Sequence, residues 1–222
     1  WNELKGTGTY LEKAAEYLTG KGYELKDSYT LGYASDPVTW DALATSRSAD
    51  SEAIINTFDG LMEYDVENVQ QPALAESYEV SEDGLVYTFH LRSGVEWVDS
   101  QGRKVADLKA DDFVAGMQHM LDAAGGLEYL VCSPAGGGCG IAGTDDYVNQ
   151  VNTDFSAVGV KALDDLTVEY TLTEPCSFFL TMLSYNVFAP MSREYFLSQG
   201  GGFGADYAPD SETYLYGKTP GN

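Results

Sequence analysis

Two stretches of the chain alternate apolar and polar residues with the two-residue period of a β-strand, and each stretch predicts a hairpin. The first hairpin has strands over 77–80 and 85–91, which flank the turn-forming residues 81–84. The second has strands over 157–163 and 166–172 on either side of an Asp-Asp turn. Because side chains alternate between the two faces of a strand, one face of strand 85–91 in the first hairpin should be strongly apolar. That face carries Leu85, Tyr87, Phe89 and Leu91.

Apolar residues three and four positions apart predict the helices. The longest covers 111–123 and ends at the glycines that follow Ala124. Another begins at Ser51, which we expect to cap its amino end, with Ile55 among its apolar positions. Shorter helices are predicted over 8–19, 177–185 and 192–198, with weaker helical character over 141–152. The residues expected inward on the longest helix are Phe113, Val114, Met117, Met120 and Leu121.

Short strands are expected over 28–34 and 95–98. The first is broken at Asp36-Pro37, because the residue before a proline avoids helical angles. Strands, hairpins and helices are thus interspersed along the chain. This order excludes a purely alternating dinucleotide-binding pattern and predicts an α/β or mixed α+β assembly.

Composition shows that this is a folded chain with an acidic surface. Its 222 residues are 44% hydrophobic and 21% charged, which is sufficient for a large core. Twelve Lys and Arg stand against 35 Asp and Glu, a formal net charge of −23. Such a surface repels phosphate backbones, so we expect no nucleic-acid partner. Solubility is the main interpretation of the acidity, and attraction for cationic ligands is the alternative.

Candidate catalytic chemistry is sparse, and we expect a protein that is not an enzyme. The sequence contains neither a GxSxG nucleophile motif nor an HExxH zinc motif. His90 is interpreted as an ordinary strand residue and His119 as a residue of a helix surface. The glycine-rich loop 136–140 lacks the lysine of a phosphate-binding loop.

No metal or cofactor is expected. The acidic groups near Asp59 and Asp145 lack the spacing of a calcium loop, and a solvated acidic face is the simpler interpretation. Cys132 and Cys139 flank the glycine loop and are candidates for a disulfide if the protein is extracytoplasmic, which leaves Cys176 buried as a small apolar residue.

Several segments, taken in order, resemble the extracytoplasmic solute-binding proteins of peptide ABC importers, the oligopeptide- and dipeptide-binding family. Residues 71–78 read QPALAESY and 83–92 read DGLVYTFHLR, both close to the family pattern, although Tyr78 stands where the family has tryptophan. Further matches in the right order are Asp36-Pro37, DGL at 59–61, ADDFV at 110–114 and VKALDDLTVEYTL at 160–172.

The resemblance implies an architecture of the α/β (mixed α+β) class. It implies a periplasmic binding protein-like type II lobe, in which a mixed sheet is flanked by helices and hairpins, truncated before the second lobe. Residues 1–27 would be an N-terminal helical extension and 28–222 the first lobe. Within that lobe, about 50–155 would form a subdomain, and 156–222 the return strands and the start of the joining region.

The resemblance also implies a function, the capture of oligopeptides or dipeptides for an ABC importer. Main-chain hydrogen bonds in the cleft between two lobes would hold the peptide. By position, Ser46, Arg47 and Ser48 would supply such bonds, and Tyr129 would line the cleft. Alternatives are a binding protein of the same fold for nickel, an oligosaccharide or another small solute, and an extracellular hydrolase.

Partners and compartment follow from the same resemblance. We expect a monomer that binds a peptide and docks on the membrane permease of an ABC transporter. No apolar run reaches the ~18–20 residues that span a bilayer, and residues 1–26 do not read as a cleavable signal. The start at Trp1 leads us to expect a processed chain or an excised piece of a longer one. The family implies an extracytoplasmic location, periplasmic or lipid-anchored at the cell surface.

Overall fold

The computed structural model describes residues 10–28, 30, 32, 35–65 and 67–204. The expected strand over 28–34 falls largely outside them, and its described residues 28, 30 and 32 lie in no strand. Residues 205–222 also lie outside them.

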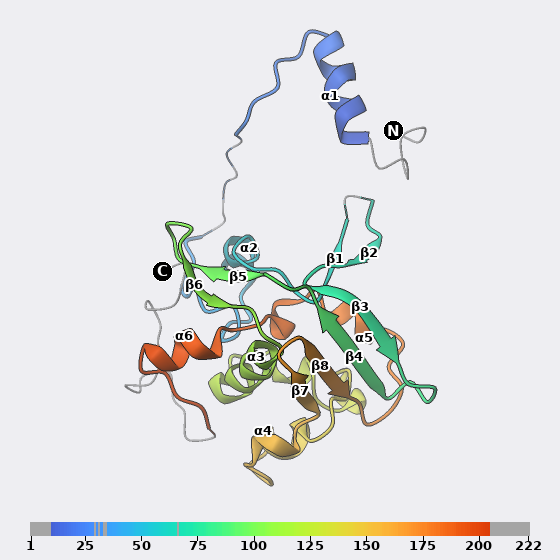
Figure 1. Cartoon of the computed structure of the whole chain (residues 1–222), viewed down its shortest axis with the longest axis vertical. Helices are drawn as coiled ribbons and strands as arrows, with labels where there is room; N and C mark the ends of the chain where they lie inside the picture. Colours follow the sequence, from blue (N-terminus) through green and yellow to red (C-terminus); the bar gives the residue numbers. More distant parts are fainter. Residues whose placement is uncertain (1–9, 29, 31, 33–34, 66, 205–222) are drawn as a thin grey trace.

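A four-stranded antiparallel sheet is the centre of the fold (Figure 1). Its strands, in spatial order, are β3 (Ala75–Val80), β4 (Val86–Leu91), β8 (Thr167–Thr171) and β7 (Val160–Asp164). Both predicted hairpins are therefore confirmed, and they meet where β4 pairs with β8, with Phe89 opposite Val168. Tyr87, Phe89 and Leu91 are buried, whereas the residues between them are half-buried, as the alternation predicted.

Helix α3 (Ala110–Ala123) packs against β7 and β8 and covers the buried face of the sheet (Figure 1). Its predicted bounds are confirmed to within one residue. Phe113, Met117, Met120 and Leu121 are buried as expected, and Val114 is half-buried against the core. Ala124 ends the helix in the left-handed conformation, with φ of 49°.

Aromatic rings fill the core between the sheet and the segments that follow it. Phe179 lies in α5 (Phe179–Met182) and Phe188 in the 3₁₀ segment η4 (Asn186–Phe188), with ring centroids 5.9 Å apart. Both rings contact Tyr170 of β8, at 5.7 and 6.1 Å. Edge-to-face and tilted contacts of this kind add to the stabilisation from burial. The core thus joins the sheet to the chain after it.

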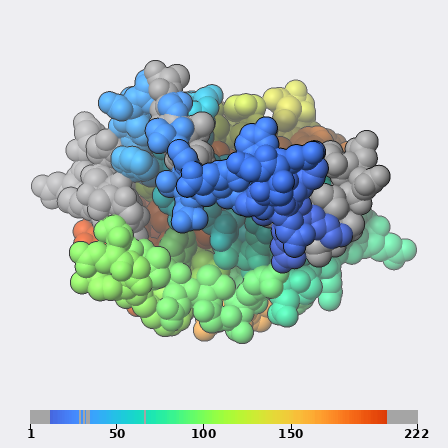
Figure 2. All heavy atoms as spheres, turned by 90° about the horizontal axis from the view of Figure 1, so that it is seen from above, coloured from blue at the N-terminus to red at the C-terminus, as the bar shows by residue number. Residues whose placement is uncertain are grey.

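Two small hairpins flank this body: β1 (Met62–Tyr64) with β2 (Gln70–Pro72), and β5 (Glu96–Val98) with β6 (Lys104–Asp107). The strand expected over 95–98 is confirmed as β5, and its hairpin is exposed at the molecular surface (bright green in Figure 2). The pairings found among the described strands are all antiparallel. The expectation of a mixed sheet was therefore wrong, whereas the α/β (mixed α+β) class is confirmed. The physical reason is connection length: neighbouring strands are mostly joined by short turns, and parallel pairs require longer crossovers.

The remaining helices are short. They are α1 (Tyr10–Gly20), α2 (Ser48–Ile54), α4 (Thr144–Val148) and α6 (Arg193–Ser198), with 3₁₀ segments η1 (Glu128–Leu130), η2 (Pro134–Gly136) and η3 (Phe155–Ala157). The prediction that Ser51 caps α2 was wrong, because the helix begins about one turn earlier, after Arg47. Ile55, expected on its apolar face, is 57% exposed, because the helix ends before it.

The cysteines are free in this structure, contrary to the disulfide considered for Cys132 and Cys139. Cys139 and Cys176 are buried, as expected for Cys176. Burial raises the pKa of the Cys139 thiol to about 12, with a further contribution from nearby Cys176. The thiol is therefore protonated at neutral pH and behaves as a small apolar group.

Candidate functional site

The segment predicted to contact peptide lies on the surface, immediately before α2. Ser46, Arg47 and Ser48 are all exposed. The backbone of Arg47 is extended, with φ of −85° and ψ of 126°. Within the described part of the chain, the amide N–H and carbonyl O of Ser46 make no hydrogen bond. An extended, exposed segment with free main-chain groups is what an added peptide strand requires.

The structure brings this segment close to the loop that leads to Tyr129. A Cβ added at Gly125 would lie 2.4 Å from the carbonyl carbon of Ala44, and one at Gly126 would lie 3.2 Å from Ser46 Oγ. The two segments therefore touch through glycine backbone. Tyr129 follows in η1 and is 55% exposed. The two parts of the predicted site thus lie on neighbouring segments.

A buried carboxylate beneath the segment was missed by sequence reasoning. Asp50 is fully buried in the first turn of α2. It accepts hydrogen bonds from the Val38 amide at 2.9 Å and from the Thr45 hydroxyl at 2.7 Å. The Arg47 guanidinium Nε lies 3.7 Å from the same carboxylate. The signal that could have revealed it is an acidic residue near the start of a helix that follows an irregular segment.

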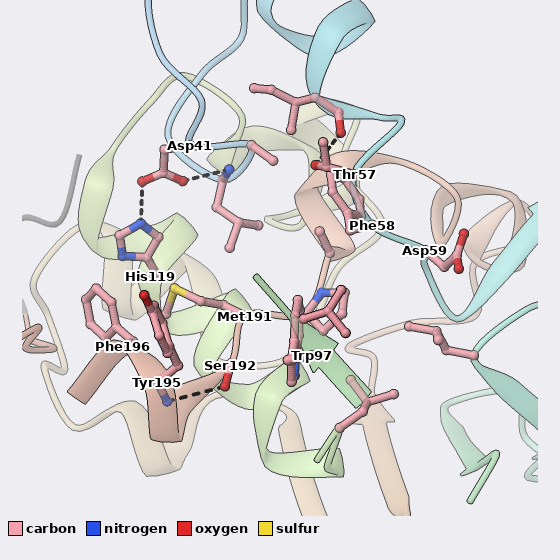
Figure 3. Close-up of a pocket in the computed structure, with 18 of the residues that line it drawn as sticks. Asp41, Thr57, Phe58, Asp59, Trp97, His119, Met191, Ser192, Tyr195 and Phe196 are labelled. Carbon is pink, nitrogen blue, oxygen red and sulfur yellow. Dashed lines mark hydrogen bonds and ion pairs between the residues drawn. The ribbon is translucent and has the colours of Figure 1, made fainter. Parts of the chain in front are cut away.

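A pocket of about 260 Å³ opens beside residues 40–43, which lead into this segment (Figure 3). Residues 40–43, the end of α2, the β5 hairpin and α6 surround it. Its walls are mainly aromatic and aliphatic, and Asp41, Asp59 and His119 supply polar groups (Figure 3). The lining aromatic residues are Trp40, Phe58, Trp97, Tyr195 and Phe196.

His119 joins α3 to the wall of this pocket, which corrects its interpretation as a helix-surface residue. The side chain is only 3% exposed, and its Nε2 lies 2.7 Å from Asp41 Oδ2 (Figure 3). Asp41 Oδ1 also accepts the Leu43 amide hydrogen at 3.1 Å. Small buried residues four positions away on either side, Ala115 and Ala123, mark a second packed face of α3. That pattern of small residues was the available sequence signal.

Two further carboxylates, the buried Asp112 and the half-buried Asp122, have structural roles. Burial raises the pKa of Asp112, which accepts hydrogen bonds from the Trp97 indole at 2.8 Å and from the Arg193 amide at 2.9 Å. Burial also raises the pKa of Asp122, which accepts from the Tyr147 hydroxyl at 2.6 Å. Each carboxylate joins α3 to a neighbouring segment, because its oxygens accept hydrogen bonds from donors on that segment.

The acidic groups and the helices of the described residues show neither a metal site nor a membrane span. The described part of the chain contains no group of three or more His, Cys, Asp or Glu side chains arranged to hold a metal ion. Asp65, in one of the acidic groups, instead accepts backbone hydrogen bonds from Glu67 and Val69. His90 is a residue of strand β4, as expected, and its Nε2 lies 3.9 Å from Glu79 Oε1. Among the described residues, no helix has both the length and the apolar character needed to cross a bilayer.

Comparison with known proteins identifies the family. The family model of the bacterial extracellular solute-binding proteins, family 5 (middle region), matches residues 69–220. This chain belongs to that family. The resemblance inferred from residues 71–78 and 83–92 is therefore confirmed. Because the family is one of extracellular solute-binding proteins, its members lie outside the cytoplasm.

Individual family members show how much of a complete protein this chain represents. The oligopeptide-binding protein AmiA of Streptococcus pneumoniae is 38% identical over 187 residues, which are 84% of this chain and 28% of AmiA. AliB of the same species is 38% identical over 211 residues, which are 95% of this chain and 30% of AliB. The chain thus spans about 30% of the length of these relatives.

A solved structure gives the same proportion. A periplasmic oligopeptide-binding protein from Borrelia burgdorferi is 30% identical and superposes with a TM-score of 0.63. The superposition covers 76% of this chain and 32% of that protein. The fold is therefore that of one part of an oligopeptide-binding protein, as expected for a lobe fragment.

Proposed function

We propose that the protein containing this chain binds peptides outside the cytoplasmic membrane and delivers them to the permease of an ABC importer. The observation that carries this proposal is the exposed segment 46–48, whose extended backbone offers the free N–H and C=O of Ser46 to a guest strand. The relatives AmiA and AliB, both described as oligopeptide-binding proteins, support it.

The chemistry of this segment suits a receptor that accepts many sequences. Hydrogen bonds to a peptide main chain are the same for every residue type except proline, so they give affinity without selecting side chains. Tyr129, on the neighbouring η1, would cover the peptide with apolar ring surface and a hydroxyl donor. The polypeptide beyond this lobe would close on the other side of the ligand.

The remaining features of the proposal follow from the family, and the absence of a nucleic-acid partner follows from the acidic surface. The receptor would act as a monomer without a cofactor, bind no nucleic acid and return its ligand chemically unchanged. It would lie in the periplasm, or on the cell surface with a lipid anchor. Residues 1–27 would extend from a first lobe formed by 28–222, in which 50–155 make up a subdomain.

Calorimetry on the complete protein tests the proposal. Di- to pentapeptides of unrelated sequence should bind with similar affinity, in the micromolar range or tighter. The matched ligand is the same peptide with N-methylated backbone amides, which keeps every side chain and removes main-chain donors. Its affinity should fall at least about tenfold, the effect of losing one or two hydrogen bonds in a desolvated site. Binding of nickel or an oligosaccharide without any peptide binding would contradict the proposal.

A backbone substitution in the segment tests the assigned residues. Ser46→Pro removes the free N–H and should weaken peptide binding about tenfold. The control is Ser100→Pro, an exposed position in the turn closed by the Gly102 amide bonding to the Asp99 carbonyl. Proline is favoured at this second turn position, so affinity should stay unchanged. Equal affinities for both variants would remove Ser46 from the site.

A further inference from the structure

The segment that precedes α2 is held mainly by side chains. From Val38 to Arg47 the chain forms neither helix nor strand. Four of its amide groups instead donate to side-chain oxygens: Val38 to Asp50, Asp41 to Thr39, Leu43 to Asp41 and Arg47 to Thr45. Irregular backbone fixed in this way keeps one conformation only while those acceptors are present.

Thr45 and Asp50 form the part of this network nearest to Ser46. The Thr45 hydroxyl donates to Asp50 Oδ2 at 2.7 Å and accepts the Arg47 amide hydrogen at 3.1 Å. It therefore bridges a buried carboxylate and the backbone on the far side of Ser46. Thr45 is 4% exposed and Asp50 is fully buried, so water does not compete for these bonds. A hydrogen bond to a charged group is among the stronger bonds in proteins.

This arrangement holds the contact segment without using its main-chain groups. The bonds end on the amide of Arg47, while the N–H and C=O of Ser46 stay free and Arg47 stays extended. On the other side, the backbone of Ala44 is limited by the close approach of Gly125. The backbone on both sides of Ser46, at Ala44 and at Arg47, is thus held in place.

We propose that Thr45 and Asp50 are positioning residues for peptide binding, which rests on the proposed function. The buried hydroxyl–carboxylate pair fixes the backbone around Ser46 in the conformation that accepts a guest strand. Neither side chain touches the ligand. Their contribution is preorganisation: a segment that is competent only part of the time binds with an affinity reduced by that fraction.

The test compares Thr45→Val with Thr45→Ser in the complete protein. Valine keeps the shape of threonine and removes the hydroxyl, and serine keeps the hydroxyl. With trialanine as the probe, Thr45→Val should bind about tenfold more weakly, and Thr45→Ser should restore at least most of that loss. In stopped-flow measurements the loss should lie in the association rate, because fewer molecules have the segment ready, while dissociation is nearly unchanged. Equal trialanine affinities for Thr45→Val and the unmodified protein, or a similar loss in both variants, would overturn the proposal.

Thr167→Val is the matched control. The Thr167 hydroxyl also donates to an aspartate, Asp164 at 3.0 Å, but in the turn between β7 and β8. The same chemical change there should leave trialanine affinity within twofold of the unmodified protein. A loss as large as that of Thr45→Val would show a general effect of lost threonine hydroxyls and would overturn the positioning role.

Amide hydrogen exchange separates this proposal from the proposed function. In Thr45→Val without any ligand, the Arg47 amide should exchange at least about tenfold faster, because its acceptor is gone. Unchanged exchange would overturn the positioning role even if peptide binds. Failure of the unmodified protein to bind any peptide would instead overturn the proposed function, and with it the ligand-binding part of this proposal, while exchange still decides how the segment is held.

Discussion

At the scale of single residues, close backbone approaches decide which side chains the fold tolerates. Gly116 lies inside α3, where an added Cβ would be 2.3 Å from the Ala189 carbonyl oxygen. Glycine normally costs a helix about 1 kcal/mol relative to alanine. Its presence here lets the segment after η4 pack directly on the helix backbone.

Replacing Gly116 with alanine should therefore destabilise the protein in spite of the better helix propensity. We expect a loss of about 1–3 kcal/mol, the usual cost of overpacking, because a backbone oxygen cannot move aside as a flexible side chain would. Gly136→Ala is the control, since nothing lies within 4 Å of a Cβ there. Urea unfolding of the two variants should differ by more than 1 kcal/mol. A Gly116→Ala variant as stable as the control would show that the two segments separate readily.

At the scale of elements, the β5–β6 hairpin is set by its turn and anchored by its tryptophan. Trp97 lines the pocket (Figure 3), and its indole donates to Asp112 of α3 at 2.8 Å. In the turn, Asp99 accepts the amide hydrogens of Gln101 and Arg103 at 2.8 and 3.0 Å. The Arg103 guanidinium completes the turn at 2.7 Å from the carboxylate. One carboxylate thus organises the whole turn.

The stability contributed by Asp99 should depend on pH. The side-chain hydrogen bond from Arg103, followed by the Arg103 amide, lowers the pKa of Asp99 to about 2 from an ordinary value of 3.8. A lowered folded-state pKa means that the contribution is fully present above the unfolded value and is lost as the pH falls toward 2.

The difference in unfolding free energy between the unmodified protein and Asp99→Asn should therefore be constant at pH 5–7 and shrink below pH 4. Because the turn is exposed, the full difference should be small. Urea unfolding at successive pH values measures it. A difference that grows as the pH falls would contradict the assigned contacts.

At the scale of the whole molecule, this chain corresponds to one part of its longer relatives. It spans about 30% of the relatives that it matches, and its free main-chain groups lie on a surface rather than in a closed site. When two halves of a site act together, the second set of contacts forms at high effective concentration, and affinity exceeds that of one half by about 10²–10⁴.

Residues 1–222 alone should therefore bind trialanine at least about a hundredfold more weakly than the complete protein. Calorimetry on both under the same conditions measures the ratio, and circular dichroism confirms that the shorter chain is folded. An affinity of residues 1–222 within tenfold of that of the complete protein would show that this lobe holds the peptide by itself.

Sequence alone determined the elements whose signal is local. The two hairpins of the central sheet and helix α3 were predicted because their residues alternate or recur with a regular period over many positions. The short strands β1, β2 and β6 were missed, since three or four residues carry too little periodicity. The family was also readable from sequence, because its matching segments occur in a fixed order.

Only the tertiary structure decided how separate segments meet. His119 was interpreted as a helix-surface residue, because the residues near it in sequence do not indicate its contact with Asp41. The burial of Asp50 against Thr45, and the approach of Gly125 to Ala44, were likewise invisible in the pattern of apolar and polar positions. The physical reason is that periodicity reports which face of an element is buried, whereas a buried polar contact depends on which other segment covers that face.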